Sequence, residues 1–334
     1  MIKKKILVTG ADGFIGSHLV EALVKKGFKV KAFTFYNSFN SWGWIDSFDK
    51  SITKELEIIS GDIRDYDSIK KASKNTDYIF HLAALVGIPY SYYAPETYID
   101  TNIKGTLNIL RASKEHNDLK IIHTSTSEIY GTPKFLPITE THPASAQSPY
   151  AASKVGADHL AFSFYTSYNL PVSIIRPFNT FGPRQSLRAV IPTIISQVLN
   201  NNETIKLGNT YSTRNFNFIS DTVNGFISAI GKKKIFGEII NIGSNYDISI
   251  KDTAGEILKL MKKKVSITEE NFRKRPEKSE VEVLKASGLK AKKLLNWSPK
   301  FKGKTGFLRA LEKTIKWYSV EDNRKKFKNN IYNF

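Results

Sequence analysis

Three glycines at three-residue spacing constrain this chain more than any other feature. Gly10, Gly13 and Gly16 follow a short apolar run at residues 4–9 and open a stretch with helical apolar spacing that ends at Gly27. Between a strand and a helix, such glycines permit a tight turn, a close pyrophosphate and tight helix packing, and the helix N-terminus faces the anion. The pattern predicts a dinucleotide site. The residues assigned to it here are Gly10, Asp12, Gly13, Phe14, Ile15 and Gly16.

Strand and helix patterns alternate along the first half of the chain. After residues 4–9, apolar runs that predict buried parallel strands recur at 29–33, 56–60, 77–82, 120–125 and 171–176, and the longest helical stretches are about 95–116 and 149–168. Repeated β-α-β units predict an α/β fold, a Rossmann-like doubly wound parallel sheet.

The pattern changes after Pro177, where segments become shorter and more polar. We therefore predict an NAD(P)-binding Rossmann domain at 1–177 and a smaller α/β substrate region at 178–324, interleaved with the first. A polar, Lys/Asn-rich tail at 325–334 is expected to be loosely ordered.

The end of the second predicted strand bears on which dinucleotide binds. An Asp or Glu about 20 residues past the glycines would hold the ribose and indicate NAD, but Thr34 stands there, followed by Asn37 and Ser38. Without a carboxylate to repel a 2′-phosphate, and with two side chains that could donate to one, the sequence favours tightly held NADP and leaves NAD open. Asp62 and Ile63 follow the third strand and could meet the adenine, although Asp62 could equally cap a helix.

Composition narrows the class of protein. The chain has no cysteine, which excludes disulfides, thiolate catalysis and Cys-ligated zinc, and we expect no metal. No apolar run approaches the roughly 20 residues of a membrane span, and no signal-peptide core follows the basic start, so we expect a cytoplasmic protein without a membrane partner.

The formal charge is +19, but 40 of the 50 basic residues are scattered lysines, so we expect no nucleic-acid partner. A positive field would still attract an anionic substrate.

A tyrosine and a lysine four residues apart predict oxidation of a hydroxyl group. Tyr150 must lose its proton near neutral pH to accept one from a hydroxyl, and Lys154, one helical turn away, is expected to lower the pKa of the phenol. Thr126, at the end of the fifth strand, is placed to hydrogen-bond the same hydroxyl. Glu128 adds a carboxylate that simple hydride transfer does not need, or else it caps the following turn.

Together these motifs resemble the extended short-chain dehydrogenase/reductase family of nucleotide-sugar enzymes. The matching segments are residues 9–19, 81–84, 102–106, 150–154 and 176–184. The resemblance implies an NAD(P)-dependent enzyme that acts on a nucleotide-sugar. Further cofactor contacts implied by it are Leu82, Ala83, Ala84, Asn102, Tyr150, Lys154 and Pro177.

The run Thr126-Ser127-Glu128 bears on the reaction. In 4,6-dehydratases of this family, oxidation at C4 acidifies the C5 proton, a glutamate removes that proton, water leaves from C6 and the hydride returns there. The dTDP-glucose enzymes carry Thr-Asp-Glu, whereas GDP-mannose 4,6-dehydratases, which use NADP, carry Ser-Thr-Ser-Glu as this chain does. The resemblance implies Glu128 as the base, and Ser127, a water or Glu128 as the proton source for the leaving hydroxyl. UDP-glucuronate decarboxylases share the run, so decarboxylase and 4-epimerase activities stay open.

Three further segments, 35–46, 182–192 and 275–281, resemble N-acetylglucosamine 4,6-dehydratases of the legionaminic acid pathway, which use UDP- or GDP-linked sugar. By that match Asn179 would hold the sugar or diphosphate, and Arg214 and Arg275 would neutralise the diphosphate. Arg188 is a further candidate, and any of these arginines could instead form a surface ion pair. The aromatic loop 35–46 would be a lid, a subunit contact or a cofactor contact.

The resemblance also implies a homodimer or a dimer-based oligomer in which the helices near 95–116 and 149–168 pair between subunits. A non-enzymatic alternative is a regulatory dinucleotide-binding protein, associated with nucleic acid through its charge. The Tyr150/Lys154 pair and Thr126 argue against that alternative.

Overall fold

The computed structural model describes residues 4–116 and 119–328. Its centre is a seven-stranded sheet in the order β11-β6-β5-β4-β1-β2-β3, with every neighbouring pair parallel. Its strands are β1 (Lys5–Thr9), β2 (Lys29–Phe35), β3 (Leu56–Gly61), β4 (Tyr78–His81), β5 (Lys120–Thr124), β6 (Val172–Pro177) and β11 (Ile239–Ile242). The predicted Rossmann-like doubly wound sheet is confirmed.

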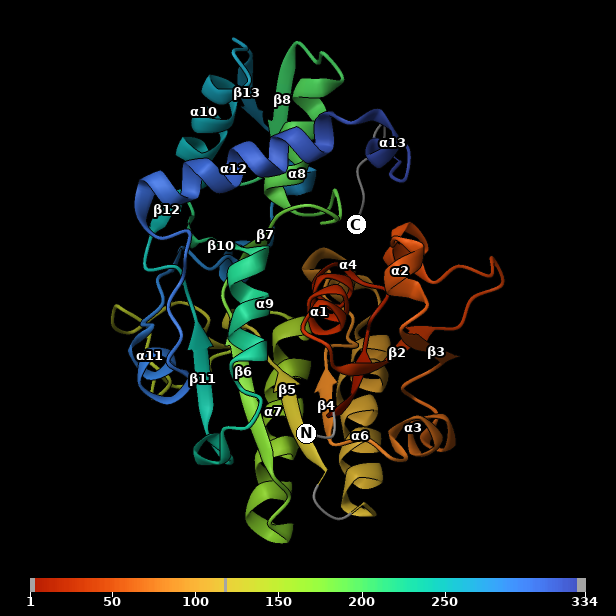
Figure 1. Ribbon diagram of the computed structural model, residues 1–334. Coiled ribbons are helices and arrows are strands. Elements are labelled where there is room, and N and C mark those ends of the chain that lie inside the picture. The colour runs from red at the N-terminus through yellow and green to blue at the C-terminus, as the bar shows by residue number, and fades with distance from the viewer. Residues whose placement is uncertain (1–3, 117–118, 329–334) are drawn as a thin grey trace.

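The six predicted strands are all present, with ends that differ from expectation by at most two residues. The sequence reading missed β11, a short strand in the more polar second half of the chain, which pairs with β6 at the edge of the sheet. Because β11 completes the first sheet, the C-terminal half is interleaved with the N-terminal half (Figure 1). A division of the chain at residue 177 stays a prediction.

Both faces of the central strands are buried, as their continuous apolar runs require. Ile6 and Val8 of β1 pack in one apolar cluster with α1 and α9, whereas Leu7 packs in a second cluster with α3, α6 and α7. Alternate residues of one strand thus serve opposite faces. The helices involved are α1 (Phe14–Lys25), α3 (Tyr66–Ser73), α6 (Gly105–Lys114), α7 (Pro149–Tyr168) and α9 (Ile219–Ile227).

The stretch predicted as one helix at 95–116 has three parts. A short helix, α5 (Pro95–Tyr98), leads through a π-helical segment, η2 (Ile99–Lys104), into α6. The buried Asn102 lies in the π segment, where its side chain bonds the backbone of Leu85 rather than its own helix. Such π segments often mark functional sites.

Above the carboxyl ends of the large sheet lies a region of small sheets and helices (Figure 1). Its strands are β7 (Thr180–Phe181), β8 (Thr204–Leu207), β9 (Thr213–Asn215), β10 (Asn217–Phe218), β12 (Asp247–Ser249), β13 (Ser266–Glu269) and β14 (Val283–Leu284). Its helices are α8 (Val190–Leu199), α10 (Ile250–Leu260), α12 (Gly303–Ser319) and α13 (Glu321–Arg324). The helix α11 (Leu289–Leu295) instead lies beside the edge strand β11, and the short helices α2 (Lys50–Thr53) and α4 (Ile88–Tyr93) belong to the first half.

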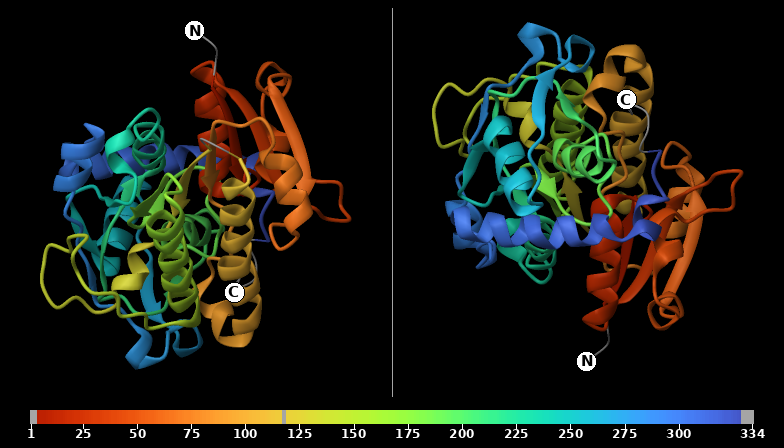
Figure 2. Two further views of the ribbon diagram at one scale, coloured as in Figure 1. Left: turned by 90° about the horizontal axis from the view of Figure 1, so that it is seen from below. Right: turned by 90° about the horizontal axis from the view of Figure 1, so that it is seen from above.

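The helix α12 extends from the C-terminal region toward the N-terminal segment (Figure 2). Its Trp317 ring lies 5.6 Å from the ring of Trp44, and Phe327 lies 5.6 Å from Trp44 as well. The predicted loose tail at 325–334 therefore includes one residue, Phe327, that packs in an aromatic cluster, and residues 329–334 lie outside the described chain. In the described parts, no helix is long and apolar enough to cross a membrane.

Candidate active site

A cavity of about 550 Å³ opens at the carboxyl ends of β1, β4 and β5, the side of an open α/β sheet where ligands bind. Most of the predicted cofactor residues line it, namely Gly10, Asp12, Gly13, Phe14, Ile15, Gly16, Asp62, Ile63, Leu82, Ala83, Ala84, Tyr150, Lys154 and Pro177. The predicted catalytic residues Thr126, Ser127 and Glu128 line the same cavity, together with Asn179. The tertiary fold thus brings the glycine turn and the predicted catalytic residues to one site.

The glycine turn has no room for side chains. Gly10 has φ +67°, and a Cβ added there would lie 2.8 Å from the backbone nitrogen of Ala83. A Cβ on Gly16 would lie 1.9 Å from the carbonyl oxygen of Gly10. Gly13 caps α1 without a side-chain hydrogen bond, and Gly13, Phe14 and Ile15 line the cavity, so this helix end offers it backbone N–H groups that no side chain caps. This cradle suits an anionic pyrophosphate.

Four predicted cofactor residues do not line this cavity. Thr34 is fully buried and its hydroxyl lies 3.2 Å from that of Ser60. The side chain of Asn37 bonds backbone groups of its own loop, including the carbonyl of Ser41 at 2.8 Å, and the exposed Ser38 follows it. These three residues miss the cavity because the strand end buries Thr34 and the chain then turns outward, leaving Phe35 as the lining residue.

Asn102 also lies behind the cavity wall. It accepts from Leu85 N–H at 2.9 Å, donates to the Leu85 carbonyl at 3.0 Å and donates to the Ser153 hydroxyl at 2.9 Å. Since Ser153 in turn donates to the carbonyl of Tyr150 at 2.7 Å, Asn102 connects the loop after β4 to the first turn of α7. Asn102 therefore holds residues of the cavity wall in position but does not line the cavity itself.

Tyr150 is buried in the first turn of α7, where Ser148 caps the helix by accepting from Ala151 N–H at 3.1 Å. Burial raises the pKa of Tyr150, and a hydrogen bond from the hydroxyl of Thr126 lowers it in part. Lys154 donates to the carbonyl of Thr124 at 2.6 Å. The pKa of Tyr150 is therefore raised overall, contrary to the expectation that Lys154 lowers it, because burial dominates and the ammonium faces a carbonyl.

Burial lowers the pKa of Lys154 to about 8, although the nearby Asp158 raises it. Asp158 is buried one turn further along α7 and accepts hydrogen bonds from Ser125 at 2.5 Å and from Arg176 at 2.9 Å. Its other oxygen lies 3.2 Å from Nε2 of His123. Burial raises the pKa of Asp158, but His123, Arg176 and Ser125 outweigh it and hold that pKa well below its usual range. The site therefore rests on a buried, ionised carboxylate that sequence analysis did not single out.

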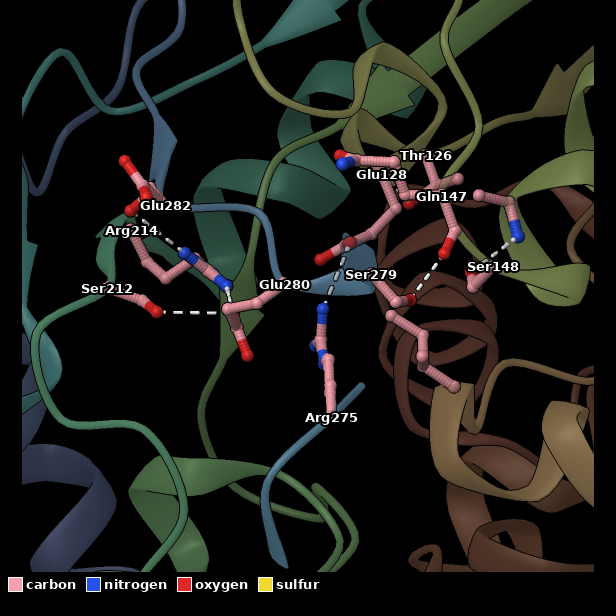
Figure 3. A network of polar contacts seen from close by, with 12 residues as sticks. Thr126, Glu128, Gln147, Ser148, Ser212, Arg214, Arg275, Ser279, Glu280 and Glu282 are labelled. Carbon is pink, nitrogen blue, oxygen red and sulfur yellow. Dashed lines mark hydrogen bonds and ion pairs between the residues drawn. The ribbon is translucent and has the colours of Figure 1, made fainter. Parts of the chain in front are cut away.

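Glu128 lies in η3 (Ser127–Tyr130), a 3₁₀ turn that Thr126 caps by accepting from Glu128 N–H at 3.3 Å. The sequence reading allowed Glu128 to be the cap, but Thr126 takes that role, which leaves the Glu128 carboxylate directed to the cavity. Its Oε2 lies 3.3 Å from Nη1 of Arg275 (Figure 3). Ser127 is almost fully buried beside it.

A second cavity of about 260 Å³ adjoins the first, because Asn179 and Thr180 line both. All four predicted substrate residues line it: Asn179, Arg188, Arg214 and Arg275. Arg214 is buried and pairs with Glu280 at 2.9 Å, and Glu280 also accepts from Ser212 at 3.1 Å (Figure 3). Arg214–Glu280 and Arg275–Glu128 are thus ion pairs within the cavity walls and not the surface pairs considered from sequence. Arg188 is exposed and contacts Ser186 at 3.3 Å.

Sequence reasoning missed several lining residues of the second cavity, including Lys206, Arg273 and Glu280. Arg273 stands two residues from Arg275, a proximity that could have identified it. Glu280 lies in the segment 275–281 that the sequence analysis singled out, but its pairing with Arg214 has no local signal, since only the fold brings the two residues together.

The sequence matches the family described as GDP-mannose 4,6 dehydratase over residues 7–309. It is 32% identical over 332 residues to a human dTDP-D-glucose 4,6-dehydratase, covering 94% of this chain and 90% of that protein. It is 33% identical over 332 residues to a UDP-N-acetyl-alpha-D-glucosaminuronate decarboxylase of Bacillus cytotoxicus, covering 96% of this chain and 100% of the other.

The fold is similar to the crystal structure of UDP-glucuronic acid 4-epimerase from Bacillus cereus in complex with UDP-glucuronic acid and NAD. The TM-score is 0.83 at 30% identity, over 94% of this chain and 98% of the other. Dehydration, decarboxylation and epimerisation thus all occur among proteins of this architecture.

Proposed function

The chain belongs to the GDP-mannose 4,6-dehydratase family, and from this relationship we propose that it is an NAD(P)-dependent nucleotide-sugar 4,6-dehydratase. The proposed substrate is UDP- or GDP-linked N-acetylglucosamine, and the product is the 4-keto-6-deoxy sugar. The observation that carries the proposal is that the carboxylate-bearing Glu128 lines the same cavity as Tyr150 and Thr126. Elimination needs a second proton acceptor, because the proton at C5 must be removed in addition to the proton of the C4 hydroxyl.

The residues around the glycine turn fit a dinucleotide, because Cβ atoms on Gly10 and Gly16 would collide with the backbone of the cradle. Gly13 and the start of α1 would hold the pyrophosphate, and Asp62 and Ile63 would lie toward the adenine. When bound, this cofactor supplies an acceptor for the C4 hydride and returns it at C6. The structural relative named above is a complex with NAD, which supports a nicotinamide dinucleotide here.

In the proposed first step, Tyr150 takes the proton of the C4 hydroxyl. Thr126 holds the same oxygen, and its hydrogen bond stabilises the phenolate form of Tyr150. The Lys154 ammonium adds positive charge in the same buried wall while its hydrogen bond to Thr124 fixes its position. These groups would oxidise the sugar and leave a ketone at C4.

In the proposed second step, Glu128 takes the proton at C5, which the C4 ketone has made acidic. The hydroxyl at C6 leaves with a proton as water, and that proton comes from Ser127, from a water or from Glu128 itself. The hydride removed from C4 would then return at C6, and a proton would return at C5. Two protons are taken up, one by Tyr150 from the C4 hydroxyl and one by Glu128 from C5, and they balance the proton that leaves in the water and the proton that returns to C5. The sum is loss of one water without net oxidation of the sugar.

The second cavity is proposed to hold the nucleoside diphosphate. Arg214 and Arg275 bring guanidinium groups to its wall, which suit bidentate contact with phosphate oxygens. Asn179 lines both cavities and would contact the sugar or the diphosphate between them. The choice of N-acetylglucosamine rests on the resemblance of residues 35–46, 182–192 and 275–281 to the legionaminic acid enzymes.

The test is incubation of the purified protein with UDP- and GDP-N-acetylglucosamine, followed by mass spectrometry of the nucleotide-sugar. We expect the loss of one water without accumulation of reduced cofactor. A product of unchanged mass would instead identify a 4-epimerase. If neither substrate changes and only UDP-glucose-type sugars do, the N-acetylglucosamine assignment is wrong.

A second candidate is decarboxylation of a sugar with a C6 carboxylate. It is favoured by the guanidinium of Arg275, which lies beside Glu128 at the edge of the first cavity and could attract such a carboxylate. The similarity to the Bacillus cytotoxicus decarboxylase supports it as well. Incubation with UDP-glucuronate and UDP-N-acetylglucosaminuronate separates the two, because only a decarboxylase releases carbon dioxide.

The proposed enzyme is a homodimer or a dimer-based oligomer. Ile99 at the start of η2 and Phe162 on α7 are 48% and 46% exposed, and pairing of these helices between subunits would cover both side chains. Light scattering of the purified chain measures the oligomeric state directly.

A further inference from the structure

In this dinucleotide-type fold, the turn that carries Asp12 lies against the end of β2, because the backbone N–H of Ala11 donates to the carbonyl of Phe33 at 3.2 Å. In such folds an Asp or Glu at the end of the second strand accepts a hydrogen bond from the 2′-hydroxyl of the adenosine ribose. Burial raises the pKa of the Asp12 carboxyl, and hydrogen bonds from the backbone of Asp12 itself and of Phe35, the last residue of β2, lower it in part. Asp12 and Phe35 line the same cavity. The acid is thus supplied by the glycine turn, and the end of β2 holds it in place.

The loop after β2 fixes this arrangement from the other side. Trp44 donates its backbone N–H to the carbonyl of Asp12 at 3.1 Å. Gly43 has φ +60°, and a Cβ there would lie 2.6 Å from the Asp12 carbonyl oxygen. Trp44 in turn packs against Trp317 of α12. The C-terminal part of the aromatic loop 35–46 therefore packs against Asp12 and helps to hold the glycine turn in position.

The charge at this end of the cavity is unfavourable for a phosphate. Among the described residues that line the cavity, the cationic side chains are Arg64 and Lys154. Arg64 is paired with Asp62 through Nε at 3.0 Å and Nη2 at 2.5 Å. Lys154 donates to Thr124 at the opposite end. With Arg64 neutralised by Asp62, the carboxylate of Asp12 leaves this end with a net negative charge.

We infer that Asp12 is the specificity-determining residue for the dinucleotide, accepting a hydrogen bond from the adenosine 2′-hydroxyl of NAD and repelling the 2′-phosphate of NADP. The inference rests on the proposed NAD(P)-dependent function and reverses the preference for NADP that the sequence suggested. That preference assumed that no carboxylate reaches the ribose, because it considered only the residues that follow β2. The fold supplies one from a position 22 residues before Thr34.

The experiment measures dinucleotide binding, so it does not depend on which sugar is turned over. Cofactor carried through purification is released by denaturation and identified by mass spectrometry, and binding of NAD⁺ and NADP⁺ is compared by calorimetry on cofactor-depleted protein. We expect the wild-type chain to carry NAD and to bind it at least about tenfold more tightly than NADP, as a like-charge contact requires. Asp12→Asn should reduce that ratio about tenfold or more, mainly through tighter NADP binding.

Asp67→Asn is the matched control, because it removes one exposed negative charge from the nearby start of α3 without lining the cavity. It should leave the ratio within about twofold of wild type, since an exposed charge is screened by salt. A wild-type protein that prefers NADP would overturn the inference, and so would an unchanged ratio in Asp12→Asn. The wild-type comparison stands even if Asp12→Asn does not fold. If the protein prefers NAD yet converts no nucleotide-sugar, the proposed function fails while the cofactor assignment holds.

Discussion

The carboxylate of Glu128 and the guanidinium of Arg275 form an ion pair, with Oε2 and Nη1 3.3 Å apart (Figure 3). The two residues are 147 positions apart in the chain and meet at the boundary between the two cavities. The pair therefore joins the proposed proton acceptor to the proposed phosphate site. If the diphosphate of a bound substrate pairs with Arg275, the charge that faces the Glu128 carboxylate would change when the substrate binds.

Replacing Glu128 by Gln should stop elimination and preserve the first oxidation. The amide keeps the shape of the side chain but cannot take the C5 proton, so the rate of water loss should fall about 10²–10⁴-fold. Exchange at C4, or absorbance of the reduced nicotinamide, should still report oxidation in a single turnover. Glu203→Gln, an exposed position outside both cavities, is the control. Water loss at the wild-type rate in Glu128→Gln would show that another group is the base.

The ion pair itself is testable by a double-mutant cycle. Arg275→Met should raise KM for the nucleotide-sugar by about tenfold or more, because a charge-assisted phosphate contact is lost. If the pair also tunes Glu128, the effects of Arg275→Met and Glu128→Gln on kcat will not add, with a coupling of about 0.5–3 kcal/mol. Arg309→Met on α12, whose guanidinium stacks on Phe301, should leave KM unchanged. Additive effects would indicate that Arg275 serves binding alone.

Asp158→Asn should destabilise the protein strongly. Asp158 and Arg176 are both buried, and loss of one charge leaves the other uncompensated, at a cost of about 3–5 kcal/mol in the free energy of unfolding. Ser125→Ala removes only one of the hydrogen bonds to the carboxylate and should cost about 1 kcal/mol. Urea unfolding measures both, and equal losses would contradict a dominant role for the charge.

Asp158 should also contribute to the loss of stability, measured as the free energy of unfolding, at acidic pH. Its folded-state pKa lies below the unfolded value of about 4, so its contribution is fully present above pH 4 and is lost as the pH falls toward the folded pKa. Unfolding free energies measured at a series of acidic pH values should fall less steeply in Asp158→Asn than in wild type. The same slope in both proteins would mean that Asp158 is not ionised in the folded state.

The lowered pKa of Lys154 predicts an alkaline limb in the rate. Because that pKa is about 8, the ammonium loses its proton as the pH rises through this value. If the positive charge supports oxidation, kcat should decline there, and Lys154→Arg, which stays charged, should move the decline to higher pH. Lys154→Met should be poorly active at every pH. A pH profile that is identical for the wild-type and Arg proteins would assign the limb to another group.

Gly16→Ala should weaken cofactor binding. The added Cβ would lie 1.9 Å from a backbone oxygen of the glycine turn, so the turn or α1 must shift. We expect the dissociation constant for NAD to rise by more than about tenfold, a loss of about 1.4 kcal/mol. Gly255→Ala is the matched control, because a Cβ there meets nothing within 4 Å and lies inside α10. That control should bind cofactor normally and gain about 0.5–1 kcal/mol of stability.

The sequence by itself determined the Rossmann-like sheet, six of its strands and most of the residues that line the cavity at the glycine turn. It could do so because these features are local. An apolar run predicts a buried strand, and glycines at this spacing between a strand and a helix predict a tight turn without room for side chains. The spacing of Tyr150 and Lys154 likewise places both side chains on one face of a helix. Of the predicted cofactor residues, Thr34, Asn37 and Ser38 do not line the cavity, because the direction of the chain after β2 has no local signature in the sequence.

Only the tertiary structure decided which distant groups meet. It paired Glu128 with Arg275 and Arg214 with Glu280, placed Asp158 beneath the site, and brought Asp12 to the end of β2. Contacts of this kind depend on how strands are ordered and how loops fold over their ends. Electrostatics depends on them in turn: burial of Tyr150 raised a pKa that sequence spacing alone suggested would fall. The physical reason is that the spacing of residues in the sequence determines only which side chains share a face of one helix or strand. The burial of a side chain and the charges around it are properties of the assembled fold.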